Sequence, residues 1–491
     1  MLIADPFSST CRPVLRGARG AVSAAHPLAV SAGLEMLLVG GSAADATIAA
    51  QAVICVLSPD NCGLGGDQLC LVRTGDGAVV AVNGTGAAPR DMHTADIDGG
   101  NSVTVPGVVD AWVVMSERWG RLPLARALEP AIRTATEGFI VGERLADAFR
   151  EYSARLVTGG AARWAMRTAP AGSLQCQPEL AALLAAIGHQ GRAAFYAGEM
   201  ADAITAAIAR AGGTLDQTDL AGHRTMVGAP VTTSWRGHAV HVQPPVSQGI
   251  LLSMVLAAEE RLGTFTPPQR DHVGVELTES SFAFRDRSCD GLALLDEPLH
   301  ADVERASRRG GPRAYLHTAG VAVADASGMT ISSLISVFDS FGSAVFVPEG
   351  GFTLNNRAAG FTLAPNACAG GKRPVHTLAP VLVETGHGCL ALATPGADGQ
   401  VQTLLQVLGH IFVEGADIAS AIARPRWRSQ DSRLLMERSH PHREDLASRG
   451  HDIVVTEDGD VRFGAIVCAG LTQGRPFCCA DWRRETWCGV A

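Results

Sequence analysis

The spacing of apolar residues predicts several helices. Residues 27–41 carry apolar side chains at helical spacing and close on two glycines, which commonly end helices. An alanine-rich helical run follows at 43–57, and Ser42 with Asp45 at its start fits a capping box. Further helical segments are predicted at 106–120, with Pro106 in the first helical position, and at 178–211, 249–262 and 400–413.

Runs rich in β-branched and apolar residues predict strands, most of them late in the chain. Residues 67–84 form two such runs around a glycine-containing turn, which predicts a hairpin. The same pattern returns at 319–338, around a turn at 326–328. Shorter strand-like runs follow at 343–348, 350–356, 379–385 and 388–396. Because we find no internal repeat and no long linker, we expect one layered body built from both parts of the chain.

Composition and charge indicate a compact globular protein. The 491 residues are 47% hydrophobic and 18% charged, with 55 glycines and a formal charge of −9. The dense basic patch at 305–313 is expected to be a solvated loop, so no nucleic-acid surface is expected. No apolar run is long enough to cross a membrane, and the N-terminus lacks a secretory signal, which predicts a cytoplasmic protein.

The usual catalytic and cofactor motifs are missing from the sequence. There is no G-x-S-x-G elbow, no HExxH and no complete phosphate-binding loop, and the histidines show no metal-ligand spacing. The run Gly63–Asp67 has the wrong glycine spacing for a dinucleotide site and is expected to form a tight turn. The twelve scattered cysteines are expected to be mostly buried thiols. We therefore expect neither a metal nor a cofactor.

One threonine stands out by its place in the sequence. His317 and Thr318 follow a segment rich in arginine and glycine and lead directly into a strand-like run. An N-terminal threonine can use its own α-amine to activate its hydroxyl, and cleavage before Thr318 would release that amine. A threonine that simply begins a strand is common, so spacing alone leaves both interpretations open.

A set of motifs carries a family resemblance. They are "SAAHPLAVSAGLEMLLVGGSAADATIAAQAV", "NCGLGGD", "VPGVVDAW", "GGTLDQTDL", "PPVSQG", "HTAGVAVADASG", "LNNRAAGF", "GKRPVHTLAP" and "TPGADGQVQ". Together, and in this order from His26 to the C-terminus, they resemble the γ-glutamyltransferase family. The resemblance implies an α+β fold of the N-terminal-nucleophile hydrolase type, a four-layer αββα sandwich. It also implies a precursor that cuts itself between His317 and Thr318 into residues 1–317 and 318–491.

Within this resemblance, the residues implied for catalysis are largely retained. Thr318 takes the place of the nucleophile, and Ser336 stands where the family usually has a threonine beside the nucleophile's amine. Gly396 and Ala397 match the glycine pair whose backbone N–H groups form the oxyanion hole. Ala397 retains the donor but tolerates fewer φ values than glycine does.

The residues implied for substrate binding depart from the typical family pattern. Relative to the family pattern, Thr85 replaces an arginine, Phe338 and Gly360 replace the asparagine and aspartate that hold an α-amine, Arg357 replaces a glutamine, and His376–Thr377 replace a serine pair. Arg90 lies near Thr85 in the sequence, but it does not align with the arginine that typical family members have at position 85. An ammonium group would lose its acceptor and its counter-charge in such a pocket. These departures resemble the branch that contains oxamate amidohydrolase and glutaryl-type acylases.

The sequence therefore predicts a self-processed threonine amidohydrolase or acyltransferase. Its expected substrate is a small amide whose acyl group carries a carboxylate, with Arg357 as the candidate anchor and a structural ion pair as the alternative role of that arginine. Two other functions stay open: a true γ-glutamyltransferase or glutathione hydrolase, and an inactive family member with a binding role. The expected partners are the two subunits cut from one precursor, with neither nucleic acid nor membrane, and a homo-oligomer is left open.

Overall fold

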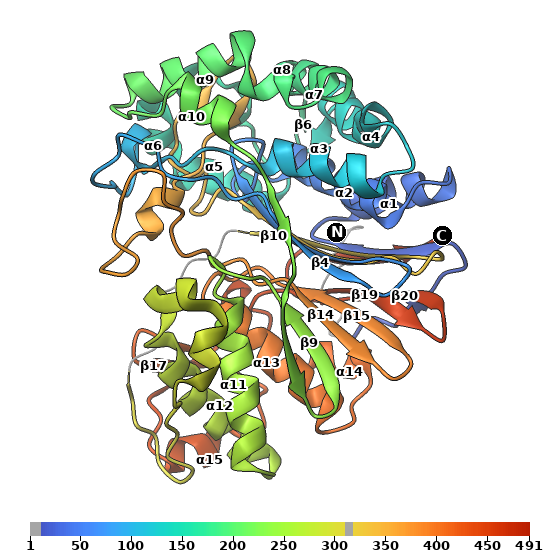
Figure 1. Ribbon diagram of the computed structural model, residues 1–491, viewed down its shortest axis with the longest axis vertical. Coiled ribbons are helices and arrows are strands. Elements are labelled where there is room, and N and C mark those ends of the chain that lie inside the picture. Colours follow the sequence, from blue (N-terminus) through green and yellow to red (C-terminus); the bar gives the residue numbers. More distant parts are fainter. Residues whose placement is uncertain (1–10, 310–317) are drawn as a thin grey trace.

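Two stacked β-sheets with helices on both outer faces make up the protein (Figure 1). This computed structural model describes residues 11–309 and 318–491, so His317 lies outside the described residues. The layers run helix, sheet, sheet, helix, which confirms the predicted four-layer αββα sandwich. None of the described helices has both the length and the apolar character needed to cross a bilayer.

The first sheet has seven antiparallel strands, and its centre is a hairpin formed by residues 319–336. In spatial order the strands are β21 (Trp487–Val490), β2 (Gly20–Ala24), β10 (Ala319–Asp325), β11 (Thr330–Ser336), β3 (Asp67–Arg73), β4 (Val79–Asn83) and β7 (Met226–Gly228). Both hairpins predicted from the sequence, β3–β4 and β10–β11, are confirmed.

The second sheet also has seven antiparallel strands and carries the two later predicted strands at its centre. Its order is β1 (Leu15–Arg16), β20 (Arg475–Ala480), β19 (Val467–Thr472), β15 (Gly388–Ala393), β14 (Val381–Thr385), β9 (His238–Val242) and β8 (Val231–Trp235). The predicted runs at 343–348 and 350–356 shorten to β12 (Phe346–Val347) and β13 (Phe352–Thr353), which pair only with each other.

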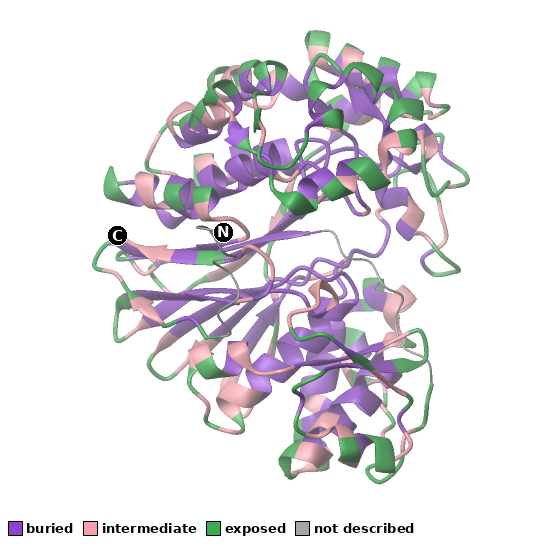
Figure 2. Ribbon diagram, turned by 180° about the vertical axis from the view of Figure 1, so that it is seen from behind, coloured by how far each residue is buried: buried purple, intermediate pink, exposed green. Residues whose placement is uncertain are grey.

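Alanine, leucine and cysteine side chains make up most of the core between the sheets, and most of the strand residues there are buried (Figure 2). Alternation along β10 sends Ala322 and Ala324 into this inter-sheet core, whereas Val321 and Val323 face the helices. The two faces of one strand therefore belong to two different cores.

Helices from the first part of the chain cover the first sheet. They are α1 (Pro27–Leu38), α2 (Ala43–Leu57), α3 (Val108–Trp119), α4 (Leu124–Glu137), α5 (Glu143–Glu151), α6 (Ser153–Thr158), α7 (Pro178–Gln190), α8 (Ala193–Tyr196), α9 (Gly198–Arg210) and α10 (Gln217–Gly222), with the short strands β5 (Phe139–Ile140) and β6 (Leu174–Gln175) between α4 and α7. The predicted capping box of α2, Ser42 with Asp45, is confirmed.

Two helix predictions need correction. The segment 178–211 is three helices, because Gly191 and Gly198 adopt left-handed φ values of 58° and 62° that interrupt it. Pro106 does not occupy the first helical position, since α3 begins at Val108 with Gly107 as its N-cap.

A second group of helices covers the second sheet. It comprises α11 (Gly249–Leu262), α12 (Pro267–Phe282), α13 (Gly399–Phe412), α14 (Ile418–Ala423) and α15 (Arg443–Ser448), with a small sheet of β16 (Trp427–Gln430), β17 (Arg433–Glu437) and β18 (Ile453–Thr456) beside them. The predictions at 249–262 and 400–413 are thereby confirmed. The twelve cysteines are all free, and most are buried, as expected.

Candidate active site

Thr318 lies at the head of β10, next to the end of β11. Because Ala319 pairs with Ile335, Thr318 and Ser336 are neighbours at the end of this hairpin. Both are almost fully buried, with 4% and 3% of their surface exposed. The Ser336 hydroxyl oxygen accepts a hydrogen bond of 2.9 Å from the backbone N–H of Phe338. The hairpin register thus places Thr318, the predicted nucleophile, next to Ser336, whose hydroxyl is predicted to lie beside the nucleophile's amine.

The side chain of Thr318 belongs to the face of β10 that looks toward the second sheet. On that face, a Cβ added to Gly320 would lie 3.0 Å from Val467 and 3.5 Å from Ala393, which belong to β19 and β15. Thr318 is two residues before Gly320, so strand alternation gives it the same direction. Pro395, two residues after β15, shares a cavity wall with Thr318. The predicted oxyanion hole directly follows this proline.

Gly396 and Ala397 form a strained turn between β15 and α13. Gly396 has φ 125° and Ala397 has φ 48°, so the alanine adopts a left-handed conformation that is uncommon outside glycine. The carbonyl of Gly396 accepts from Arg428 at 3.2 Å, and that of Ala397 accepts from Gln248 at 3.0 Å. Within the described chain neither N–H has an acceptor, so both donors are available to a ligand.

Buried carboxylates on α12 hold the chain that leads toward Thr318. Glu276 accepts from the backbone N–H of Ser307 at 2.8 Å, and Glu279 accepts from that of Arg309 at 3.0 Å. Arg305, Arg308 and Arg309 are exposed, as expected for the basic patch, whose residues 310–313 lie outside the described residues.

The guanidinium of Arg357 is a buried cation. It begins the 3-10 helix η5 (Arg357–Gly360), and only 1% of its surface is exposed. Its guanidinium lies 3.6 Å from the centre of the Phe338 ring, and none of its three nitrogens has a hydrogen-bond partner among the described residues. Burial lowers the pKa of Arg357 to about 10, and the charge of Asp67 opposes this shift. Burying a charged group without hydrogen bonds costs free energy, and a ligand that supplies acceptors would offset this cost.

Gly360 provides the space that Arg357 occupies. A Cβ at position 360 would lie 2.6 Å from the Nη2 atom of Arg357. The two departures from the family pattern are therefore coupled sterically, because the arginine side chain fills the place that a larger residue at 360 would take.

His376 and Thr377 are buried close to the same charges. His376 Nε2 lies 3.3 Å from Asp67 Oδ2, and its Nδ1 accepts from the N–H of Leu378 at 3.2 Å. Burial, followed by the charge of Arg357, lowers the pKa of His376 to about 4, so the ring is neutral and donates through Nε2. The carbonyl of Thr377 accepts from Gln248 at 3.0 Å.

Thr85 is buried and its hydroxyl is used internally. That hydroxyl donates to Asn83 Oδ1 at 2.6 Å, and the Thr85 carbonyl accepts from Arg373 Nε at 2.8 Å. Arg90, in contrast, is exposed and pairs at 3.1 Å with Asp219 on the surface.

Asp67 is the site residue that the sequence reasoning missed. The sequence predicts a tight turn at Gly63–Asp67, yet the last residue of this run begins β3 and pairs with Ser336 in the sheet. Its Oδ1 also accepts from the N–H of Gly86 at 3.2 Å. The one available signal was a carboxylate placed directly between a glycine-rich turn and a buried strand.

A cavity of about 250 Å³ has Thr318 in its wall. Residues after β2, after α2 and at the start of α5 line it, together with Arg484 and Glu485 before β21. None of the predicted substrate-binding residues lines this cavity. The carbonyls of two lining residues, Asn61 and Asp60, accept from the backbone N–H groups of Val337 at 3.2 Å and Phe341 at 3.0 Å, so the cavity wall is fixed to the segment that follows β11.

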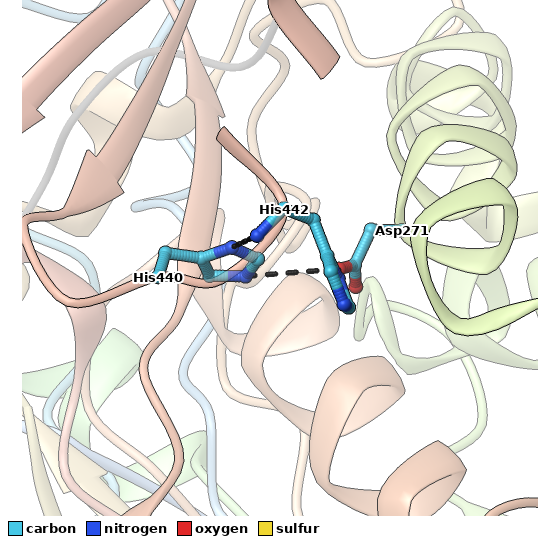
Figure 3. A group of neighbouring side chains, drawn as sticks. All are labelled: Asp271, His440 and His442. Atoms are coloured by element: carbon cyan, nitrogen blue, oxygen red, sulfur yellow. Dashed lines mark hydrogen bonds and ion pairs between the residues drawn. The ribbon is translucent and has the colours of Figure 1, made fainter. Parts of the chain in front are cut away.

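Asp271, His440 and His442 form a group of potential metal ligands far from Thr318 in the sequence (Figure 3). His442 Nδ1 lies 2.6 Å from Asp271 Oδ2, and Trp427 donates to Asp271 Oδ1 at 3.0 Å. His440 Nδ1 accepts from the N–H of His442 at 3.3 Å, so its remaining nitrogen carries the proton and faces Asp271. These contacts account for the cluster as a hydrogen-bonded group.

Comparisons with known proteins match nearly the whole chain. A family model described as Gamma-glutamyltranspeptidase matches residues 29–305 and 301–489. Oxamate amidohydrolase proenzyme from Klebsiella pneumoniae is 31% identical, over 91% of this chain and 93% of that protein. Acylase ACY 1 proenzyme from Pseudomonas sp. (strain SE83) is 30% identical, over 89% and 88%. The solved structure of cephalosporin acylase from Bacillus halodurans covers 99% of this chain and 98% of its own, with a TM-score of 0.88 at 28% identity.

Proposed function

Since the chain belongs to the gamma-glutamyltranspeptidase family and is an N-terminal-nucleophile amide hydrolase or acyltransferase, we propose that Thr318 is its nucleophile and that its substrate is an amide with a carboxylate on the acyl group. The environment of Arg357 is the observation that supports a carboxylate on the acyl group. A buried guanidinium with no hydrogen-bond partner in the described chain suits a carboxylate that arrives with the substrate.

The first step is self-cleavage before Thr318. The Thr318 hydroxyl attacks the carbonyl carbon of residue 317, the peptide C–N bond breaks, and the freed nitrogen takes the hydroxyl proton. Water then hydrolyses the resulting ester, which leaves residues 1–317 and a second chain that begins with the free α-amine of Thr318. The relatives support this step, because the oxamate amidohydrolase and the acylase are both described as proenzymes.

The mature site then transfers an acyl group. The α-amine of Thr318 takes the proton from its own hydroxyl, whose oxygen attacks the amide carbon, and the N–H groups of Gly396 and Ala397 stabilise the oxyanion. The C–N bond breaks as the proton passes to the leaving nitrogen. Water or an amine acceptor then releases the acyl group from Thr318, and the hydroxyl is restored.

Phe338 and Gly360 disfavour an acyl group with an α-ammonium. The ring of Phe338 is covered by the Arg357 guanidinium, and Gly360 has no side chain that could pair with a cation. An ammonium would therefore meet another positive charge. This favours glutaryl-like or oxamate-like amides over γ-glutamyl compounds.

Processing and substrate choice are tested on the purified full-length chain. Mass spectrometry should find a cut between His317 and Thr318 without added protease, and Thr318→Ala should remain one chain. The mature protein should hydrolyse glutaryl or oxalyl amides faster than γ-glutamyl amides. Preference for γ-glutamyl compounds would establish the γ-glutamyltransferase function instead, and an uncut, inactive wild type would establish the binding role.

A further inference from the structure

One face of α12 holds residues 302–309, the linker that leads toward the cleavage site. His272, Glu276 and Glu279 are spaced four and three residues apart, so their side chains lie on the same face of this helix. His272 is fully buried, and its Nε2 lies 2.8 Å from the carbonyl oxygen of Asp302. The two carboxylates accept from backbone N–H groups farther along the linker. The face thus contacts the linker at its beginning and at its end.

Both carboxylates are buried against the linker. Glu276 has no exposed surface, and 8% of Glu279 is exposed. The second oxygen of Glu276 accepts from the Ser307 hydroxyl and lies 3.5 Å from Arg309 Nη1, while the second oxygen of Glu279 accepts from Ser429 at 2.7 Å. Burying a carboxylate costs free energy, and the linker supplies donors that offset this cost. The polar face of α12 therefore matches the segment that lies on it.

The part of the chain after Thr318 contacts the same linker. The N–H of Ala306 donates to the carbonyl of Arg449 at 2.9 Å, and Arg308 Nε donates to that of Gly450 at 2.7 Å. Arg308 has a left-handed φ of 48°, which a residue other than glycine keeps only where its surroundings hold it. The linker therefore follows one defined path, and eight residues separate its end from Thr318.

We propose that Glu276 and Glu279 are positioning residues for self-cleavage. By fixing the end of the linker on α12, they limit where the carbonyl of residue 317 can lie relative to the Thr318 hydroxyl. Such an attack is fast only when the reacting atoms are held in contact, and closing a shorter loop costs less entropy. This inference rests on the proposed function, because it needs self-cleavage before Thr318. It adds that residues outside the pocket assigned to the substrate control the rate of maturation.

The rate of self-cleavage tests this role on the full-length chain, made by cell-free synthesis and followed on denaturing gels. The double variant Glu276→Ala, Glu279→Ala should cut itself at least about fivefold more slowly than the wild type. Glu279→Gln keeps an acceptor oxygen, so it should cut itself faster than Glu279→Ala. Glu259→Ala is the matched control, because Glu259 is a buried carboxylate on the adjacent helix α11 and pairs with Arg270 at 2.7 Å. It should cut itself at the wild-type rate.

A variant in the linker leaves the buried carboxylates in place. Arg309→Ala removes the guanidinium that lies 3.5 Å from Glu276. It should slow self-cleavage about twofold, the effect of losing a partly exposed ion pair. Arg305→Ala, at an exposed position of the same linker, should leave the rate unchanged.

The activity of the mature protein separates positioning from a weakened fold. Once fully cut, the double variant should hydrolyse glutaryl anilide with a kcat/KM within about twofold of the wild type. A parallel loss of self-cleavage and of kcat/KM, an equal slowing in Glu259→Ala, or an unchanged rate in the double variant would overturn the inference and leave the proposed function standing. A wild type that stays uncut would refute the proposed function, and the inference would fall with it.

Discussion

Replacing Arg357 by lysine is the sharpest test of the acyl pocket. The change retains a positive charge near Asp67 but removes the planar fork that can hold a carboxylate with two bonds. Loss of one hydrogen bond to a charged group costs about 1.5–3 kcal/mol. At 1.36 kcal/mol for each factor of ten, kcat/KM for carboxylate-bearing amides should fall about 10- to 150-fold.

The assay compares two amides that have the same leaving amine and differ only in the acyl group. Glutaryl anilide should show the full loss in Arg357→Lys, whereas butyryl anilide, which has no carboxylate, should change little. Self-cleavage should proceed as in the wild type, because Arg357 takes no part in the attack on residue 317. An equal loss for both anilides would mean that Arg357 only supports the fold, and the reasoning from its missing hydrogen bonds would be refuted.

Two further predictions follow from the surroundings of that arginine and from buried histidines. Gly360→Ala places a methyl group 2.6 Å from the present position of Arg357 Nη2, so the guanidinium must move; kcat/KM should fall for glutaryl anilide but not for butyryl anilide, and an unchanged ratio would contradict the coupling. Burial lowers the pKa of His376 and of His440 from 6.5 to about 4, so between these values the unfolded chain binds protons that the folded protein does not. The free energy of unfolding in urea should therefore decrease as pH falls from 6.5 to 4, and this slope should be smaller in His440→Asn; a slope of opposite sign in this window would disprove the assignment.

Sequence reasoning identified the fold where local signals agreed with tertiary packing. The helix α2 has a capping box and an apolar composition, and the β10–β11 hairpin has alternation around a short turn. The helix α12 has a capping box, Thr266 with Gln269, but it lacks an apolar face, because its polar side chains are buried and find partners elsewhere in the sequence. Arg270 pairs with Glu259, and Glu279 holds both Arg309 and Ser429. Hydrophobic periodicity cannot detect a helix whose buried face is partly charged.

The residues of the site also divide into those that local sequence signals place and those that only tertiary packing brings together. Thr318 and Ser336 could be placed together because a hairpin register is a local property. The contact of Asp67 with His376 joins residues that are 309 positions apart, and the cavity joins segments near Asp60, Arg144 and Arg484. No pattern within any of these segments indicates that they meet, so only the packing of the layers could reveal them.

The order of strands has a consequence for refolding. In the first sheet, β10 and β11 lie between β2 and β3, so strands from before and after position 318 are interleaved. Cutting the chain before Thr318 removes no hydrogen bond of this sheet, but it converts folding from a one-chain into a two-chain reaction. Recovery from denaturant would then depend on concentration, and either chain alone would expose unpaired strand edges that invite aggregation. The uncut precursor should refold readily, whereas the mature protein should be protected mainly by slow unfolding.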